Sequence, residues 1–183
     1  IREVTKGRAW VSTWAGYVVE VLRGVNPASV QQNNTYRLAH ENFRSDIDCF
    51  AGTTSYETRS VGDRFTPFQL MSSLTLNGKQ TLAEIDYRTF IGGPKIYGRQ
   101  HSERETKAIL QRELGTTLIN GIGTYFADWS QGEGRDGVAY FDDPEILSVI
   151  SKSRAIYAEA LAAEQKPGPV TQIAVIVSPE SVW

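Results

Sequence analysis

One short stretch of this sequence places two carboxylates and a guanidinium where they could act together. Residues 79–89 have the pattern of a buried strand that turns polar at its C-terminal end. Side chains alternate between the faces of a strand, so Leu82, Glu84, Asp86 and Arg88 point the same way. Such a face, just past an apolar run, suits the wall of an active site at the C-terminal end of a barrel strand. It also fits a structural ion pair, in which Arg88 neutralises Glu84 or Asp86.

Further candidates for substrate contact follow the ends of other predicted strands. Together with the stretch above they give the set Trp14, Tyr17, Tyr56, Arg59, Asp86, Arg88, Phe126, Asp128 and Trp129. Aromatic rings at strand ends form flat platforms for sugars or other rings, although Trp14 and Tyr17 suit packing inside a barrel equally well. His40, His101 and Cys49 are far apart and lack the spacing of metal ligands, so neither a metal site nor a cofactor is predicted.

Four strand–helix units would position these side chains. The predicted strands are 10–19, 47–52, 79–89 and 119–129, and the predicted helices are 35–44, 66–77, 102–118 and 143–165. This alternation predicts an α/β fold with a parallel sheet and helices outside it. Since the polar cluster follows the strand in each unit, one functional face is expected at the strand C-termini. Four units are half of an eightfold barrel, and a whole barrel takes about 250 residues.

Local signals mark the ends of these elements and a change of domain. Thr66 and Pro67 are expected to cap and open the second helix, and Ser102 with Glu105 forms a capping-box pattern. A linker at 166–169 precedes an apolar stretch at 170–177, which is expected to be a buried parallel strand that opens a new domain. The predicted organisation is a partial barrel at 1–166, then a linker and the start of a second α/β domain at 167–183.

Composition narrows the class of protein. The 183 residues are 40% hydrophobic and 22% charged with a net charge of −2, which is ordinary for a soluble globular protein. The absence of a basic block argues against nucleic acid as a partner, and no apolar run predicts a membrane span. The single cysteine, Cys49, excludes an internal disulfide and is compatible with a reducing compartment, so a cytoplasmic location is favoured. The chain starts without Met, so Ile1 is expected to be a cut end.

The stretch around Glu84 also carries a resemblance to a known family. Residues 84–89, Glu-Ile-Asp-Tyr-Arg-Thr, follow an Asn-Gly-Lys at 77–79. They resemble a Glu-Asp-Asp-Thr-Arg-Thr-like run in family 42 of the glycoside hydrolases, the β-galactosidase-like enzymes. The similarity extends to residues 46–48, 55–59, 123–128, 141–146 and 178–181.

This resemblance implies a fold and a reaction. The chain would supply strands 5 to 8 of a (β/α)8 TIM barrel, and the following domain would be flavodoxin-like. Glu84 would be the catalytic nucleophile at the end of strand 7, and the acid/base Glu would belong to strand 4, upstream of Ile1. Retaining glycosidases use two carboxyl groups about 5–5.5 Å apart. Arg88 would favour the ionised nucleophile, and Asp86 and Asp128 would accept hydrogen bonds from sugar hydroxyls.

A second interpretation is a non-catalytic carbohydrate-binding or assembly module on a degenerate half-barrel. It is motivated by Ile85 and Tyr87, which replace polar residues of the family pattern, and by the missing acid/base. In both interpretations the expected partner is a carbohydrate. Because a half-barrel has two open sheet edges, two copies could also pair, or the chain could associate with the missing half.

Overall fold

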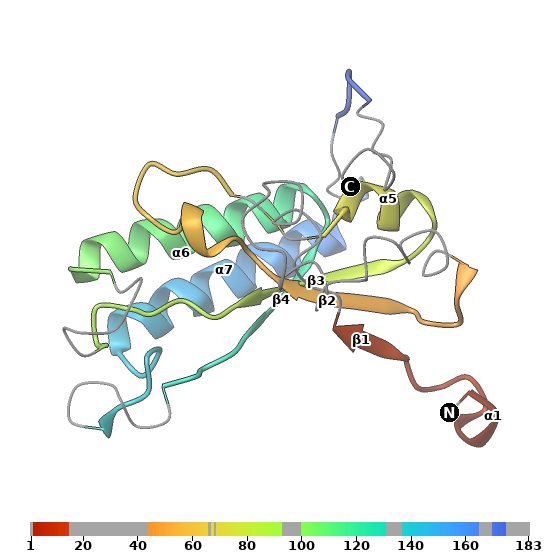
Figure 1. Ribbon diagram of the computed structural model, residues 1–183, viewed down its shortest axis with the longest axis horizontal. Coiled ribbons are helices and arrows are strands. Elements are labelled where there is room, and N and C mark those ends of the chain that lie inside the picture. Colours follow the sequence, from red (N-terminus) through yellow and green to blue (C-terminus); the bar gives the residue numbers. More distant parts are fainter. Residues whose placement is uncertain are drawn as a thin grey trace, which may run out of the picture. The chain divides into compact units, whose positions relative to one another are not determined.

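The computed structural model describes residues 2–14, 44–65, 67, 69–92, 100–130, 137–164 and 170–174, in which helices and strands alternate along the chain (Figure 1). The elements are α1 (Arg2–Thr5), β1 (Ser12–Trp14), β2 (Cys49–Thr53), the 3-10 helix η1 (Tyr56–Thr58), α5 (Met71–Leu76), β3 (Gln80–Ile85), α6 (Glu103–Ile119), β4 (Gly123–Phe126) and α7 (Pro144–Ala162). Among these residues no helix is both long and apolar enough to cross a membrane.

The four strands form one parallel sheet in the order β1-β2-β3-β4. β1 and β2 pair with Ser12 opposite Cys49 and Trp14 opposite Ala51. Parallel neighbours need a crossover connection, and in the sequence α5 separates β2 from β3 and α6 separates β3 from β4. The prediction of an α/β fold with a parallel sheet is therefore confirmed.

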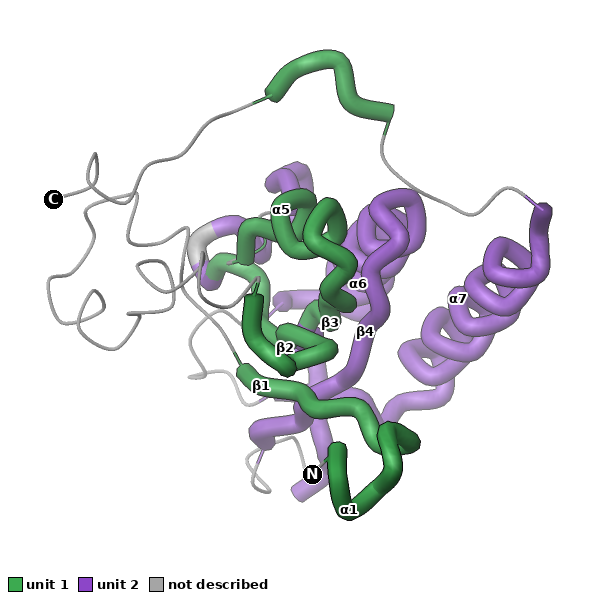
Figure 2. The backbone as a smooth tube through the Cα atoms, turned by 90° about the vertical axis from the view of Figure 1, so that its right-hand side faces the viewer, with its two compact units in different colours: residues 1–55, 67–83, 170–183 green, residues 56–66, 84–169 purple. Residues whose placement is uncertain are grey.

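The chain forms two compact units, and the boundary between them falls within β3 (Figure 2). Unit 1 comprises residues 1–55, 67–83 and 170–183, and unit 2 comprises residues 56–66 and 84–169. In unit 1, every residue of β2 is buried, and Phe50 packs with Leu74 and Ile47. The thiol of Cys49 is buried there, and its burial raises its pKa.

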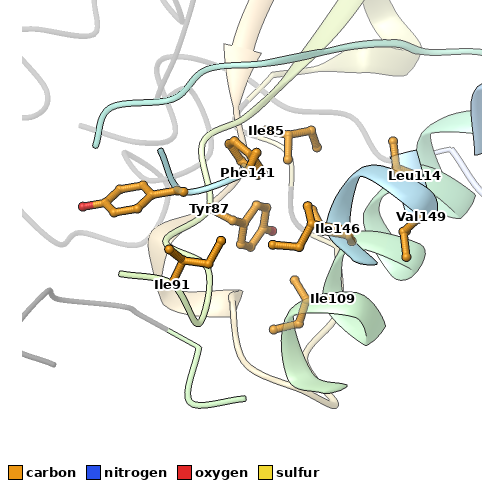
Figure 3. Close-up of a cluster of buried hydrophobic side chains, with 10 residues drawn as sticks. Ile85, Tyr87, Ile91, Ile109, Leu114, Phe141, Ile146 and Val149 are labelled. Atoms are coloured by element: carbon orange, nitrogen blue, oxygen red, sulfur yellow. The ribbon is translucent and has the colours of Figure 1, made fainter. Parts of the chain in front are cut away.

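The larger apolar core belongs to unit 2, where α6 packs against α7. Figure 3 shows side chains from the end of β3 and from both helices meeting in this core. Its buried members are Ile85, Tyr87, Ile91, Ile109, Leu110, Leu114, Tyr140, Phe141, Ile146 and Val149. This packing holds the end of β3 against the helices, and β3 is the strand that carries Glu84.

The caps of the two long helices follow from local sequence. The Ser102 side chain accepts a hydrogen bond from the backbone N–H of Glu105 at 3.2 Å, as the capping-box pattern predicts. At the start of α7, the Asp143 carboxylate accepts from the N–H groups of Glu145 and Ile146 at 2.9 and 3.1 Å. Each cap satisfies N–H groups that have no partner inside the helix.

The predicted start of the second helix at Thr66 and Pro67 is wrong. α5 begins at Met71, and Leu70 at its N-cap makes no side-chain capping bond. Pro67 instead forms an isolated antiparallel bridge with Thr54, which holds that segment extended. A pairing with a distant residue has overridden the local helix signal. The helix ends at Asn77 as expected, followed by Gly78 at a φ of 69°.

Other boundaries also differ from the predicted ones. β3 ends at Ile85 rather than at residue 89, and Ile119 belongs to α6 rather than to the fourth strand. Residues 170–174 form no strand, and Val170 and Ile173 are 95% and 78% exposed, so a buried strand is wrong for this part of 170–177. Residues 35–43 of the predicted helix 35–44 and residues 15–19 of the first predicted strand lie outside the described residues.

Candidate functional site

Glu84 lies on β3 and is 7% exposed. Its Oε2 accepts a hydrogen bond from the hydroxyl of Tyr125 on β4, and its Oε1 accepts a longer one of 3.4 Å from the indole Nε1 of Trp129. The two strands are neighbours, and the N–H of Ala127 bonds the carbonyl of Ile85 at 3.0 Å. The pairing of β3 with β4 therefore brings both donors to the carboxylate.

Asp86 follows two residues later and has different partners. Its Oδ1 accepts from Nη2 of Arg59 at 2.6 Å, and its Oδ2 accepts from the hydroxyl of Tyr56 at 3.0 Å. Nη1 of Arg88 lies 3.6 Å from Oδ2. The side chains of Arg59 and Asp86 are only 5% and 2% exposed. Asp86 thus belongs to a buried ion pair with Arg59. The partner that the sequence pattern suggested for it, Arg88, is associated with Asp86 at the longer distance of 3.6 Å.

Two aromatic rings enclose the Arg59 guanidinium. Its central carbon lies 3.9 Å from the ring centroid of Tyr56 and 4.7 Å from that of Tyr87. A guanidinium over an aromatic face is attracted by the negative face of the ring, and more strongly where water is excluded. The Arg88 guanidinium also lies over the Tyr56 ring, at 5.4 Å. Tyr56 is therefore engaged by two cations and by Asp86.

Helix α6 holds the segment that carries Tyr56 and Arg59. The guanidinium of Arg112 donates to the carbonyls of Thr58, Ser60 and Asp63 at 3.2, 2.9 and 2.7 Å. These three bonds fix the turn that follows η1, and with it the position of Arg59. The role of Arg112 left no signal in the sequence, because its acceptors are backbone carbonyls about fifty residues away.

Glu113 completes this cluster from the buried side of α6. Its side chain is fully buried, and its Oε1 pairs with Nη2 of Arg112 at 2.7 Å. Burial raises the pKa of Glu113, against the opposing effect of Arg112 and of hydrogen bonds from Arg112 and Tyr87. Desolvation lowers the pKa of Arg112, but the charge and hydrogen bond of Glu113, together with those of Tyr87, outweigh it and the net direction is upward. The two residues stabilise each other's charged forms.

The remaining candidates of unit 2 have distinct surroundings. The Asp128 carboxylate accepts from the N–H groups of Ser130 and Phe141 at 2.8 and 3.4 Å, so it braces the loop after β4. Phe126 packs edge-on against Phe141, with ring centroids 5.3 Å apart, at the border of the core. Trp129 is 59% exposed although its N–H reaches Glu84, which leaves ring surface for a ligand.

Two predicted residues are not brought into this cluster by the described structure. Trp14 ends β1 in unit 1 and is 46% exposed, and Tyr17 lies outside the described residues. In the described ranges no group of three or more His, Cys, Asp or Glu side chains is placed to hold a metal ion.

The candidate site thus consists of two neighbouring groups on one strand end. The first is Glu84 with Tyr125 and Trp129, and the second is Asp86 with its ion-pair partners. The first group can supply a carboxylate, oriented by two donors, beside an exposed aromatic ring. Tyr125 was not among the predicted site residues. It lies on the strand that was predicted to follow the Glu84 strand in the sequence.

No protein-family model matches this chain, and neither a curated protein nor a solved structure matches it significantly.

Proposed function

We propose that this chain carries the nucleophile of a retaining glycoside hydrolase, and that Glu84 is that nucleophile. The observation that carries the proposal is the environment of the carboxylate. Glu84 is almost fully buried on the strand β3, hydrogen-bonded by Tyr125, and within reach of the exposed indole of Trp129. A carboxylate that attacks a sugar needs a fixed orientation, and an aromatic ring beside it offers a face for the sugar.

The two oxygens of Glu84 have different roles in the proposed reaction. Oε2, bonded to the Tyr125 hydroxyl, anchors the side chain, and Oε1, which accepts the longer bond from Trp129, attacks the anomeric carbon. The new bond joins Oε1 to that carbon while the glycosidic C–O bond breaks and the leaving oxygen takes a proton from an acid/base carboxyl. Water then attacks the same carbon, the acid/base takes its proton, and the Glu84 carboxylate is released.

We propose that the acid/base carboxyl is neither Asp86 nor Asp128. Asp86 and Asp128 are engaged by Arg59 and by backbone N–H groups respectively. A test should therefore need the nucleophile but no acid. Dinitrophenyl 2-deoxy-2-fluoroglycosides meet this condition, because their leaving group departs without protonation and the fluorine slows the second step.

The experiment incubates the chain with such reagents in the galactose, glucose, galacturonate and glucuronate series and follows the intact mass. The proposal expects an adduct of one fluoroglycosyl group, mapped by peptide sequencing to Glu84. Glu84→Gln should abolish the adduct, whereas Asp128→Asn, which also neutralises a carboxylate after the sheet, should retain it.

An adduct on another residue, or no adduct with any reagent, would refute the assignment of Glu84. Retained binding of a sugar without labelling would instead favour the second interpretation, a carbohydrate-binding module that does not catalyse. The exposed ring of Trp129 is the observation that supports this alternative, because stacking a sugar needs no nucleophile.

A further inference from the structure

Two guanidiniums share a single carboxylate at the end of β3. Arg59 holds Asp86 by a 2.6 Å bond between side chains that are 5% and 2% exposed. Arg88 approaches the same carboxylate only to 3.6 Å, at the oxygen that already accepts from the Tyr56 hydroxyl. Asp86 is therefore neutralised mainly by Arg59, and the cluster of Arg59, Asp86 and Arg88 has one positive charge in excess.

The excess charge is on Arg88, which retains donors. A guanidinium has five N–H donors and is always charged in proteins. Across the described residues, the recorded polar contacts of Arg88 all run from Nη1 to Asp86, to the carboxylate at 3.6 Å and to the backbone carbonyl at 3.5 Å. Nε and Nη2 have no acceptor in that part of the chain. These are the atoms that form a two-pronged bond with a carboxylate.

Partial burial makes this guanidinium a better anion binder than a surface arginine. The Arg88 side chain is 27% exposed, and its guanidinium lies over the ring of Tyr56. A charge beside an apolar surface is less screened than one in bulk water, so its attraction for an anion is stronger. The remaining exposure leaves it reachable by a ligand.

Arg88 also lies within reach of a ligand that contacts Glu84. The two residues are four positions apart, so their Cα atoms are at most about 14 Å from each other. Asp86 lies between them, with its oxygens already occupied. One ligand can therefore contact both residues, with Arg88 reaching a substituent and Glu84 reaching the anomeric carbon.

We infer that Arg88 forms a subsite for an anionic substituent, a carboxylate or a sulfate ester, on the sugar next to the cleaved bond. The inference rests on the proposed function of Glu84 and names its substrate class as acidic glycans. The planar fork of Nε and Nη2 matches two coplanar oxygens, which places uronic acids first.

Calorimetric titration of the chain tests this subsite. The probes are disaccharides containing galacturonate or glucuronate, their uncharged methyl esters, and a galactose 6-sulfate disaccharide. Loss of a charge-assisted hydrogen-bonded pair corresponds to about a tenfold change in affinity, so we expect each uronate to bind about tenfold more tightly than its ester. A preference for the sulfate alone would identify the anion as a sulfate ester.

Three variants locate the effect. Arg88→Gln should reduce the ratio of acid to ester affinity to about one, and Arg88→Lys, which keeps the charge without the fork, should leave an intermediate ratio. Arg154→Gln removes the same charge from an exposed position on α7 and should leave the ratio unchanged. Melting curves of all variants establish that each one is folded.

Equal affinity for acid and ester, no binding of any acidic probe, or a ratio that survives Arg88→Gln would overturn the inference. Its failure is distinct from that of the proposed function. If Glu84 is labelled but acids are not preferred, Glu84 is still supported as the nucleophile and the Arg88 subsite is refuted. If acids are still preferred in Glu84→Gln and the native chain is not labelled, the Arg88 subsite is supported and Glu84 is refuted as the nucleophile.

Discussion

The buried pair between Arg59 and Asp86 makes a quantitative prediction for Asp86→Asn. The substitution keeps the size of the side chain and one acceptor oxygen for Arg59, but it removes the charge. Arg59 is 5% exposed and its guanidinium lies over the rings of Tyr56 and Tyr87, so water cannot replace the lost carboxylate. An uncompensated buried cation is then left in the folded state.

The size of the effect follows from this burial. Breaking a buried pair by removing one partner costs about 3–5 kcal/mol, and the acceptor that Asn retains places Asp86→Asn near the lower end. This is a large part of a typical free energy of unfolding of about 5–15 kcal/mol. For a chain of this length, it corresponds to a fall in melting temperature of roughly 6–20 °C.

Urea unfolding followed by circular dichroism measures this cost. Arg88→Gln is the matched control, because it breaks the 3.6 Å contact to the same carboxylate and should cost less than about 1 kcal/mol. The double variant Arg59→Met with Asp86→Leu removes both charges and should regain much of the stability lost in Asp86→Asn. If Asp86→Asn costs no more than Arg88→Gln, the buried pair does not stabilise this fold as argued.

Three other predictions address unit 2. Tyr125→Phe removes the donor to Oε2 of Glu84 and should slow fluoroglycoside labelling by roughly 10–100-fold, measured by mass spectrometry; an unchanged rate would contradict its anchoring role. Burial raises the pKa of Glu113, so the native state binds its proton more tightly and loses stability as pH rises from about its ordinary value of 4.5. As the pH rises from 4 to 7.5, the free energy of unfolding of Glu113→Gln, measured in urea, should therefore increase relative to that of the native chain. A difference between the two chains that does not change with pH would exclude Glu113 as the cause. Asp143→Ala removes the cap of α7 and should cost about 1 kcal/mol in the same assay, and no change would show that the cap is dispensable.

The sequence predicted those parts of the fold that depend on local signals. Ser102 caps its helix, as its sequence pattern predicted, because a short polar side chain can reach the free N–H groups of its own first turn. The same kind of signal failed at Thr66 and Pro67, where pairing of Pro67 with Thr54 outweighed the local helix preference. The ends of the third and fourth strands were placed too late, at residues 89 and 129 instead of Ile85 and Phe126. For β3 the reason is that apolar alternation continues past its last ladder bond.

The candidate site shows the same division between near and distant residues. The sequence identified Glu84, Asp86 and Arg88 as one polar group at a strand end, and it raised both an active-site wall and an ion pair. It did not distinguish which carboxylate has which partner. In the structure Asp86 contacts Arg59 and Arg88, and Glu84 accepts hydrogen bonds from the neutral donors Tyr125 and Trp129.

The sequence alone determined the alternation of strands and helices, the caps of α6 and α7, and the presence of acidic and basic side chains after an apolar strand. These features depend on residues a few positions apart, whose spacing the chain itself sets. Only the tertiary structure decided that Arg59 pairs with Asp86, that Tyr125 bonds Glu84, and that Arg112 holds the turn before Arg64. Those contacts join residues that are tens of positions apart, and they form only when packing of the sheet and helices brings them together and excludes water.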